Sequence, residues 1–552
     1  MSMASPSLIE LLLQQQQGLS AVDEFSTWHG EAMSISSRYQ ALMPTASPAP
    51  GQQYAFEVDL DTCSGCKSCV VACHNLNGLD ESETWRKVGL LTSKSASLPI
   101  VQHVTTACHH CVEPGCMNGC PVLAYEKDAI TGIVRHLDDQ CFGCQYCIMM
   151  CPYEVPQYNH TLGIVRKCDM CSQRLAVGEA PACVQACPNQ AIQITIVNLE
   201  AIQRENSNNA TLALVPSSPP SNTTLPTTRY IHSRHALNET RVCAEERDFA
   251  EVVSSDSILD RPQHGHWPLA LMLVFTQASV GMFFVLFSWL LIQPLNAENT
   301  TRSFTFKLSL MATIIGVVGV HLALLHLGRP MYAFRAFLGW RRSWLSREAI
   351  LFGFYMAATV TTCAAIWFAS SLTAVIPGIF VIGTAFSGGL AVLSSGMIYV
   401  ATKRSQWNMK RTFCDFGLTT LGLGAAGAAT LCDSPEIGWI LGCSGMVLII
   451  GSCAFSISDW YVARKIPSNW KEFSARSGRL LRGDLSHLWS LQWAFMAGGL
   501  LIAAAMLSLE SGGVTEMVGR WSLFFCLVIA KFISRFLYFA SIVTHRMPGA
   551  ES

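Results

Sequence analysis

Sixteen of the 23 cysteines in this 552-residue chain lie between Cys63 and Cys187, in four groups that each end in C-x3-C. The groups are Cys63, Cys66, Cys69 and Cys73; Cys108, Cys111, Cys116 and Cys120; Cys141, Cys144, Cys147 and Cys151; and Cys168, Cys171, Cys183 and Cys187. The first and third have the spacing C-x2-C-x2-C-x3-C, in which three cysteines hold a [4Fe–4S] cluster and the fourth binds a neighbouring cluster. Because each cluster needs four thiolates, these cysteines predict four [4Fe–4S] clusters and a domain that transfers electrons.

Disulfides and structural zinc explain the cysteines less well. A disulfide framework suits short secreted chains, and the opening MSMASPSLIELLL has no basic region of a secretory signal. Zinc sites use pairs of C-x2-C at wider spacing. A proline follows Cys120, Cys151 and Cys187, as it does in cluster motifs. Because metal would replace much of the apolar core, we expect the apo-protein to be poorly folded.

Composition indicates a membrane portion, because charged residues are only 14% of the chain and hydrophobic residues are 50%. The net charge of −1 gives no indication of nucleic acid as a partner. Long uncharged runs begin after about Trp267. We therefore predict an N-terminal arm over 1–50 with one short helix at 8–17, followed by an α+β ferredoxin-like cluster domain over 51–200. A linker over 201–262 is expected next, and its Ser-, Asn-, Thr- and Pro-rich stretch 204–228 should be extended and solvated. The last predicted part is an all-α membrane anchor over 263–545.

Eight stretches approach the ~20 apolar residues that a helix needs to cross a bilayer. They are 268–292, 308–326, 350–370, 374–400, 416–431, 437–457, 488–508 and 521–542. The fifth is short and rich in Gly and Ala, which suits close packing against other helices. The sequence predicts eight spans, with seven as the alternative, and disfavours a soluble helical core.

Basic residues predict the orientation of these spans. The loops after the second, fourth and sixth stretches hold five, four and six of them, fifteen in all: Arg329, Arg335, Arg341, Arg342 and Arg347; Lys403, Arg404, Lys410 and Arg411; Arg464, Lys465, Lys471, Arg476, Arg479 and Arg482. The opposite loops hold three, Arg302, Lys307 and Arg520. Since basic loops face the cytoplasm, we expect the cluster domain on the cytoplasmic face of the cell membrane.

Few titratable residues lie within the spans, and these are the candidates for function. His321 and His326 are about 140° apart around a helix, so they do not share one small pocket, and the other histidines are soluble or at span edges. We therefore predict no haem. His326 is either an interfacial histidine bonded to a neighbouring helix or a quinone contact that takes a proton, and Glu348 is either a proton relay or a helix N-terminal carboxylate. Lys531 and Arg535 are expected to be paired or to snorkel.

The motifs then point to a family. The first half resembles the iron–sulfur subunit of the dimethyl sulfoxide reductase family of respiratory molybdoenzymes, in the order and spacing of its cysteine groups and in WRKV at Trp85–Val88. The second half resembles the eight-span anchor of the same enzymes, in GHWPL at Gly265–Leu269, LHLGRPMYAF at Leu325–Phe334 and LSREA at Leu345–Ala349. Where relatives have two polypeptides, this chain looks fused.

The resemblance implies how the cysteines share the clusters. The four implied sets are Cys63, Cys66, Cys69 and Cys187 (set one); Cys168, Cys171, Cys183 and Cys73 (set two); Cys108, Cys111, Cys116 and Cys151 (set three); and Cys141, Cys144, Cys147 and Cys120 (set four). Nitrate-reductase relatives carry Trp at the position of Cys144 and hold a three-iron cluster there. This chain keeps the cysteine, so we expect four four-iron clusters.

The resemblance also implies a menaquinol site at His326, with Glu348 in the proton path. The family can have Arg where this chain has Tyr332, and nearby Arg335 is the candidate substitute. The implied partner is a separate molybdopterin-containing catalytic subunit, besides lipid and quinone, and the direction of electron flow stays open. Several relatives hold their soluble subunits outside the cytoplasm, whereas the basic loops here favour the inside. The alternatives are a polysulfide- or tetrathionate-reductase-type anchor, a redox-driven ion pump, and a tether without a quinone site.

Overall fold

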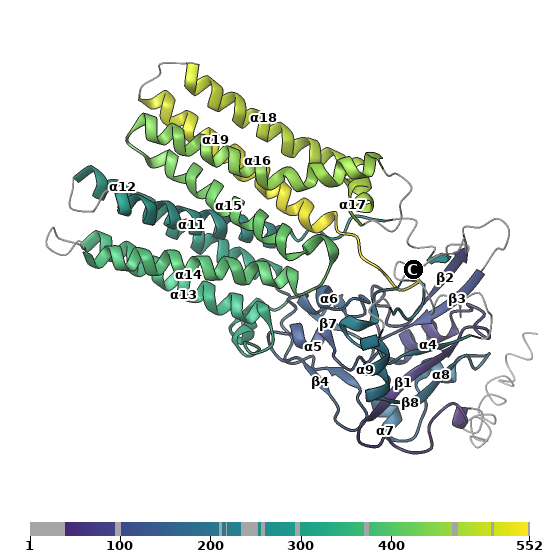
Figure 1. Cartoon of the computed structure of the whole chain (residues 1–552). Helices are drawn as coiled ribbons and strands as arrows, with labels where there is room; N and C mark the ends of the chain where they lie inside the picture. The colour runs from purple at the N-terminus through teal and green to yellow at the C-terminus, as the bar shows by residue number, and fades with distance from the viewer. Residues whose placement is uncertain are drawn as a thin grey trace, which may run out of the picture.

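The computed structural model describes residues 39–93, 101–208, 212–216, 218–232, 252–254, 260–292, 299–368, 375–465, 473–508 and 513–549. An α+β part and a bundle of long helices lie end to end, and the last residues of the chain return from the bundle to the α+β part (Figure 1). The helix expected at 8–17 and most of the predicted arm lie outside the described residues.

Two three-stranded sheets and two hairpins form the β-structure of the first part. The strands are β1 (Gln52–Asp59), β2 (Lys87–Ser93), β3 (Val101–Thr106), β4 (Tyr125–Lys127), β5 (Val134–His136), β6 (Gln157–Asn159), β7 (Ile164–Arg166), β8 (Ile192–Asn198), β9 (Arg229–Ile231) and β10 (Val252–Ser254). In one sheet β1 lies between antiparallel β8 and parallel β9, and in the other β2 lies between antiparallel β10 and β3. The hairpins are β4–β5 and β6–β7. The α+β fold predicted for this part is confirmed.

Short helices lie between the strands. They are α4 (Ser68–Leu76), α5 (Gly115–Gly119), α6 (Tyr146–Met150), α7 (Ser172–Ala176) and α8 (Ala182–Gln185). Four of them (α4, α5, α6 and α8) contain the third cysteine of a group. The turns before α4 and α6 are alike, because Gly65 and Gly143 both have φ of 74°, and Lys67 and Gln145 have φ of 63° and 60°. Glycine adopts such left-handed angles without steric cost. The first and third cysteine groups are therefore two copies of one local structure.

The segment 204–228 is not the extended, solvated linker that its composition predicted. Helix α9 (Leu199–Asn208) covers its start, and the short helix η1 (Ser221–Thr223) lies in a buried stretch. Thr227 donates its hydroxyl to the carbonyl of His109 at 2.8 Å, and the amide of Val112 donates to the carbonyl of Leu225. Small hydroxyl side chains here satisfy buried backbone groups, so a polar composition serves packing rather than solvation.

In the second part, the described residues include eight long α-helices and one shorter one. They are α11 (Trp267–Ile292), α12 (Asn299–Leu322), α13 (Trp344–Phe368), α14 (Val375–Val400), α15 (Met409–Leu431), α16 (Pro435–Lys465), the shorter α17 (Phe473–Arg482), α18 (Ser486–Ser508) and α19 (Val514–Ala540). Among the described residues, seven helices are long and apolar enough to cross a membrane, against the eight predicted.

Helix α15 accounts for the difference. It covers the predicted fifth stretch, but Lys410, Arg411 and Asp415 near its start and its many Gly and Thr residues lower its hydropathy. Its middle is buried against α11 and α16. A Cβ atom added to Gly281 of α11 would lie 1.8 Å from the carbonyl oxygen of Thr420, and one added to Gly424 would lie 2.2 Å from the carbonyl carbon of Gly281. Such close helix packing requires small residues, so α15 faces protein rather than lipid.

The two parts meet through the connection between α12 and α13. It contains the 3-10 helices η4 (Ala323–His326) and η5 (Pro330–Phe337). The amide of Arg329 donates to the carbonyl of Phe142 at 3.0 Å, and the amide of Gly339 donates to the carbonyl of Pro121 at 2.7 Å. Both acceptors lie beside cysteines of set four. The connection between α12 and α13, at the end of the membrane bundle, therefore contacts the loops that carry cysteines of set four.

Candidate metal centres and membrane-facing site

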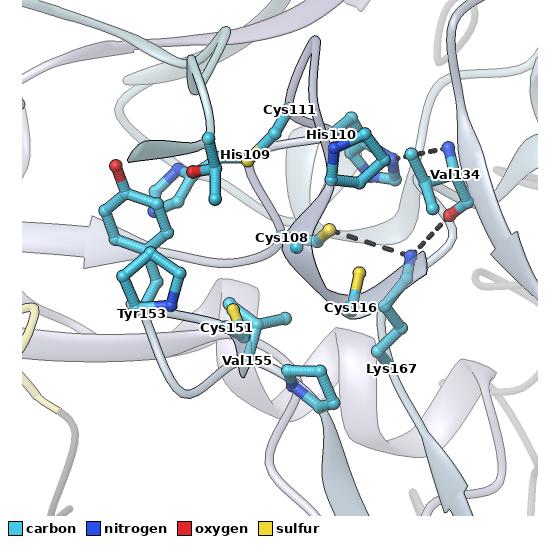
Figure 2. A pocket seen from close by; sticks show the side chains of 15 residues that line it. Cys108, His109, His110, Cys111, Cys116, Val134, Cys151, Tyr153, Val155 and Lys167 are labelled. Atoms are coloured by element: carbon cyan, nitrogen blue, oxygen red, sulfur yellow. Dashed lines mark hydrogen bonds between the residues drawn. The ribbon is translucent and has the colours of Figure 1, made fainter. Parts of the chain in front are cut away.

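Cysteines from distant parts of the sequence gather around two cavities. One has about 370 Å³ of space free of protein atoms and is lined by Cys108, Cys111, Cys116 and Cys151, which are set three (Figure 2). The other has about 310 Å³ and is lined by Cys63, Cys66, Cys69 and Cys187, which are set one. In each case three cysteines of one group meet the last cysteine of another, as two-cluster ferredoxin motifs require.

The remaining two sets are also drawn together. Cys73 lies within electrostatic range of Cys168, Cys171 and Cys183. In the same way, Cys120 lies near Cys141, Cys144 and Cys147. In the part of the chain that the structure describes, no three Cys, His, Asp or Glu side chains converge tightly enough for a single metal ion. The thiols of sets one and three surround cavities instead, an arrangement that fits a multi-iron group rather than one zinc ion.

Burial opposes ionisation of these thiols. It raises the pKa of Cys73 to about 12 and the pKa values of Cys120 and Cys151 to about 11. Thiolates are the ligands of iron–sulfur clusters, so the iron must supply the positive charge that offsets their burial. The residues therefore fit the predicted group, because burial disfavours the thiolate form of these ligands unless a metal supplies positive charge.

Backbone amides point at the sulfurs in a repeated way. The amide of Ala124 donates to Cys120 Sγ at 3.2 Å, and the amide of Ala191 donates to Cys187 Sγ at 3.3 Å, four residues along the chain in both cases. A proline follows each of these cysteines and turns the chain so that this amide can reach back. Hydrogen bonds to sulfur are one means by which a protein adjusts the reduction potential of a cluster.

His326 lies directly against set four. Its Nε2 atom is 3.2 Å from the carbonyl oxygen of Cys144. The neighbouring Leu327 packs in the same hydrophobic cluster as Cys144 and Ala349. His321, by contrast, is exposed on the bundle surface, and its Nδ1 atom contacts only the carbonyl of Val317 in its own helix, at 2.8 Å. The two histidines are thus separated, as their helical spacing predicts.

Glu348 is the fifth residue of α13, just after its first turn, and it is buried, with 6% of its surface exposed. It lies within electrostatic range of the hydroxyls of Tyr146 and Tyr399 and close to Ser395. Tyr146 belongs to the cluster domain and donates its hydroxyl to the carbonyl of Ile398 in α14, at 3.0 Å. Both His326 and Glu348 therefore border the Cys144–Tyr146 segment, His326 at one end and Glu348 at the other.

Tyr332 and Arg335 are placed differently. The guanidinium of Arg335 lies 4.6 Å above the ring of Tyr332, and its Nη1 atom donates to the carbonyl of Asp139 at 3.0 Å. Tyr332 is 40% exposed. The pair contacts the surface of the cluster domain. Among the described residues, neither Tyr332 nor Arg335 forms a hydrogen bond or ring contact with His326 or Glu348.

Sequence reasoning missed His266 and Asp415. The ring of His266 lies 4.9 Å from the ring of His326, and the ring of His264 lies 4.9 Å from His266. Burial beside these rings lowers the pKa of His266 to about 3, so this ring is neutral. His266 stands in the GHWPL motif, which marked the anchor, but its place at a span edge concealed its contact with His326.

Asp415 is the partner of the two cations in the last helix. Its carboxylate accepts from Lys531 Nζ at 2.5 Å and from Arg535 Nη1 at 2.7 Å. Arg535 also donates to Gln277 Oε1 at 3.1 Å, and Lys531 donates to Ser452 Oγ at 3.0 Å. Lys531 and Arg535 are therefore paired charges, as predicted.

Comparison with known proteins agrees with the two-part structure. The sequence model of the family described as DMSO reductase anchor subunit (DmsC) matches residues 263–540, half of the chain, and that of the 4Fe-4S dicluster domain matches residues 100–196. The B chain of the anaerobic dimethyl sulfoxide reductase of Escherichia coli strain K12 is 33% identical over 172 residues, which cover 30% of this chain and 82% of that protein. Thiosulfate reductase electron transfer subunit PhsB of Salmonella typhi is 37% identical over 155 residues, which cover 28% of this chain and 80% of that protein.

Fold, cysteines and matches together define an iron–sulfur electron-transfer domain fused to an integral-membrane anchor. This protein belongs to the DMSO reductase anchor subunit (DmsC) family, and its first part is similar to the B chains of dimethyl sulfoxide reductases. The resemblance drawn from the cysteine groups and the anchor motifs is confirmed.

Proposed function

We propose that this chain passes electrons between membrane quinol, menaquinol in particular, and a separate molybdopterin-containing catalytic subunit, through four [4Fe–4S] clusters held by the four cysteine sets. Quinol docks where His326 and Glu348 border set four. The clusters, when bound, supply one-electron carriers in series. The protein supplies the cysteine ligands, the contact between the membrane part and the cluster domain, and the groups that take up protons.

The observation that carries this proposal is the contact of His326 with Cys144. A 3.2 Å contact joins a histidine at the end of a membrane span to the backbone of a cluster ligand. The amides of Arg329 and Gly339 and the hydroxyl of Ser343, which donates to Gly119 at 2.7 Å, fix the same cysteine loops to the membrane part. The distance between a quinol beside His326 and set four is thus set by direct contacts.

His326 and Glu348 have distinct proposed roles. Oxidation of one quinol releases two electrons and two protons, so the site needs a group that takes a proton from a quinol hydroxyl. His326 can accept at one ring nitrogen while its other nitrogen is oriented by the Cys144 carbonyl. Glu348, buried beside the Tyr146 and Tyr399 hydroxyls, is the proposed acceptor of the second proton. Tyr332 and Arg335 are proposed to act on quinol only from a distance, because their contacts are with each other and with the Asp139 carbonyl.

The test replaces one histidine and keeps another as the control. We expect His326→Ala to reduce quinol oxidation by at least 100-fold, the usual contribution of a positioned acid–base group, with the cluster EPR signals unchanged. His321→Ala removes a histidine from the same span that contacts only its own helix, and it should leave the rate within twofold of the unaltered protein. Equal rates in the two variants would contradict the quinol site and favour a tether.

The catalytic partner follows from the relatives. The similar proteins include chains named for dimethyl sulfoxide reductase and for thiosulfate reductase, so the terminal substrate belongs to the partner and is not fixed by this chain. We propose that the partner docks on the cluster domain and that electrons can pass in either direction. Purification of the complex from membranes should yield a second, larger chain and molybdenum in a one-to-one ratio with this chain, and a purified complex without molybdenum would contradict the proposal.

For the cluster domain we propose the cytoplasmic face, from the fifteen basic residues on its side. Several of them also hold the domain in place: Arg329 and Arg335 donate to the carbonyls of Asp138 and Asp139. A membrane-impermeant amine reagent applied to intact cells should leave exposed Lys67 unmodified and should modify it after the membrane is opened. Modification of this lysine in intact cells would reverse the assignment.

A further inference from the structure

We infer that Lys167 is a fixed cation that raises the reduction potentials of the centres held by sets two and three, at the junction between the two halves of the electron path. The inference rests on the proposed four-cluster function. Lys167 immediately precedes Cys168 of set two in the sequence, and its side chain reaches Cys108 of set three. One residue therefore touches both sets.

The position of the ammonium group is closely defined. Its Nζ atom lies 3.6 Å from Cys108 Sγ and donates to the carbonyl of Cys168 at 2.9 Å and to the carbonyl of Val134. Lys167 is only 3% exposed. Figure 2 shows its side chain extending into the cavity of set three, toward Cys108 and Cys116. The hydrogen bonds prevent the group from turning away to solvent.

The groups that contribute most of the negative charge facing this cation are the thiols of Cys108, Cys116 and Cys168, and Asp169 contributes less. Within the described part of the chain, no carboxylate forms an ion pair with Lys167. The nearest, Asp169, already accepts from the amide of Cys171 at 2.9 Å and from the hydroxyl of Ser172 at 3.2 Å. A buried charge without a counter-charge is costly. The cation is thus complementary to metal centres whose ligands include Cys108, Cys116 and Cys168.

The direction of the effect follows from charge. Reduction adds one electron to a centre, and a nearby fixed positive charge stabilises the more negative state. Screening is weak because the site excludes water. Removal of the charge should therefore lower the potentials of the two nearest centres and leave the more distant ones unchanged. Set four should be affected least, because Lys167 contacts none of its cysteines among the described residues.

Lys127 provides a matched control. Its Nζ atom donates to the carbonyls of Cys111 and Val112, at 3.1 and 2.9 Å, so it is bound to the loop of set three. Unlike Lys167, it is only half-buried, and among the described residues it forms its hydrogen bonds with carbonyls and none with a sulfur. Solvent therefore screens its charge. Comparison of the two lysines separates a charge held at the sulfurs from one that only braces the loop.

The experiment is an EPR-monitored redox titration of the full chain in its membrane complex. Lys167→Met and Lys167→Gln should shift the equilibrium of one or two of the four centres at least tenfold toward oxidation, which is 59 mV or more for a one-electron couple. Lys167→Arg, which keeps the charge, should shift it by less than half as much, and so should Lys127→Met. Iron content should equal that of the unaltered protein in all four variants.

Three results would overturn the inference. The first is unshifted potentials in both neutral Lys167 variants, and the second is an equal shift from Lys127→Met. The third is loss of iron from both neutral variants while Lys167→Arg retains it, because Lys167 would then be needed for cluster assembly. The unaltered protein distinguishes failure of the proposed function. If it shows fewer than four cluster signals, the four-cluster proposal is wrong. If its four signals are present and the Lys167 variants leave them unshifted, only this inference is wrong.

Discussion

Both parts of the molecule bury cations, but they neutralise them in different ways. In the membrane bundle, Lys531 and Arg535 are fully buried and share the carboxylate of Asp415. In the cluster domain, Arg86 and Lys167 are just as buried, and their neighbours are cysteine sulfurs, a hydroxyl and carbonyls. The bundle thus contains its own counter-charge. The cluster domain is electrostatically complete only when its thiolates and metal centres are in place.

Arg86 illustrates the second case. Its Nη1 atom donates to Thr105 Oγ1 at 3.2 Å, and its guanidinium lies 4.6 Å above the ring of Phe56. Its Nη2 atom is buried and has no hydrogen-bond partner among the described residues. The thiols near it are those of Cys69, Cys73, Cys168 and Cys183, which belong to sets one and two. A buried guanidinium with an unsatisfied nitrogen implies that the environment includes an anionic group bound by those sulfurs.

Removal of iron should therefore affect the two parts very differently, and this is the largest effect that we predict. Without metal, the buried thiols and the two cations lose their mutual stabilisation, so the cluster domain should unfold. Hydrogen exchange measured by mass spectrometry after anaerobic chelation should show loss of protection in β1 and β8. Helix α11, which is buried within the bundle, should keep its protection. Protection retained in β1 and β8 would show that the cluster domain is stable by its apolar core alone.

Loss of the carboxylate should destabilise the membrane part by a smaller but clear amount. Asp415→Asn leaves two buried cations without a counter-charge, and breaking a buried pair in this way costs about 3–5 kcal/mol. Unfolding of the detergent-solubilised protein, followed by the fluorescence of bundle tryptophans, should show this loss. The added substitution Lys531→Met should restore part of the stability, because one stranded cation is removed. No recovery in the double variant would mean that Asp415 acts through its hydrogen bonds rather than its charge.

These features also show what the sequence could and could not predict. The cysteine spacing predicted the iron–sulfur domain, and apolar length predicted the membrane bundle, because both patterns are local in sequence. Asp415 was missed because it lies one residue outside the apolar stretch predicted as a span, and its partners are more than 100 positions away. Helix α15 fell outside the seven apolar spans because it is buried by protein and so needs less hydropathy.

The candidate site likewise has features that a local sequence pattern reveals and contacts that it does not reveal. His326 was found from a motif, and its contact with the Cys144 carbonyl spans 182 positions, which no local pattern reveals. The contact of His266 with the same ring was missed for that reason. The Ser- and Thr-rich segment at 218–228 was predicted to be solvated because its composition is polar. A polar composition indicates solvation only when the polar side chains face water. There the hydroxyls of Ser218 and Thr227 donate to the carbonyls of Val215 and His109 instead.

The smallest predicted effect concerns the ion pairs that join the two parts. Glu154 of the cluster domain lies 3.7 Å from Arg404, which precedes α15, and 3.4 Å from Arg546 in the tail after α19, and it accepts from the hydroxyl of Thr544 at 3.2 Å. Beyond these contacts, Met547 is buried in a core of the cluster domain. Because Glu154 is one-fifth exposed, solvent weakens its ion pairs, and Glu154→Gln should cost about 1 kcal/mol or less. Hydrogen exchange in the tail 541–549 should accelerate while exchange within the bundle does not change.

Met547→Ala, which removes apolar packing from the same tail, should accelerate hydrogen exchange in the tail more than Glu154→Gln does, since burial of such a side chain contributes about 2–5 kcal/mol. If Glu154→Gln had the larger effect, the two parts would be held together by charge, as the bundle is at Asp415, and not by apolar contact.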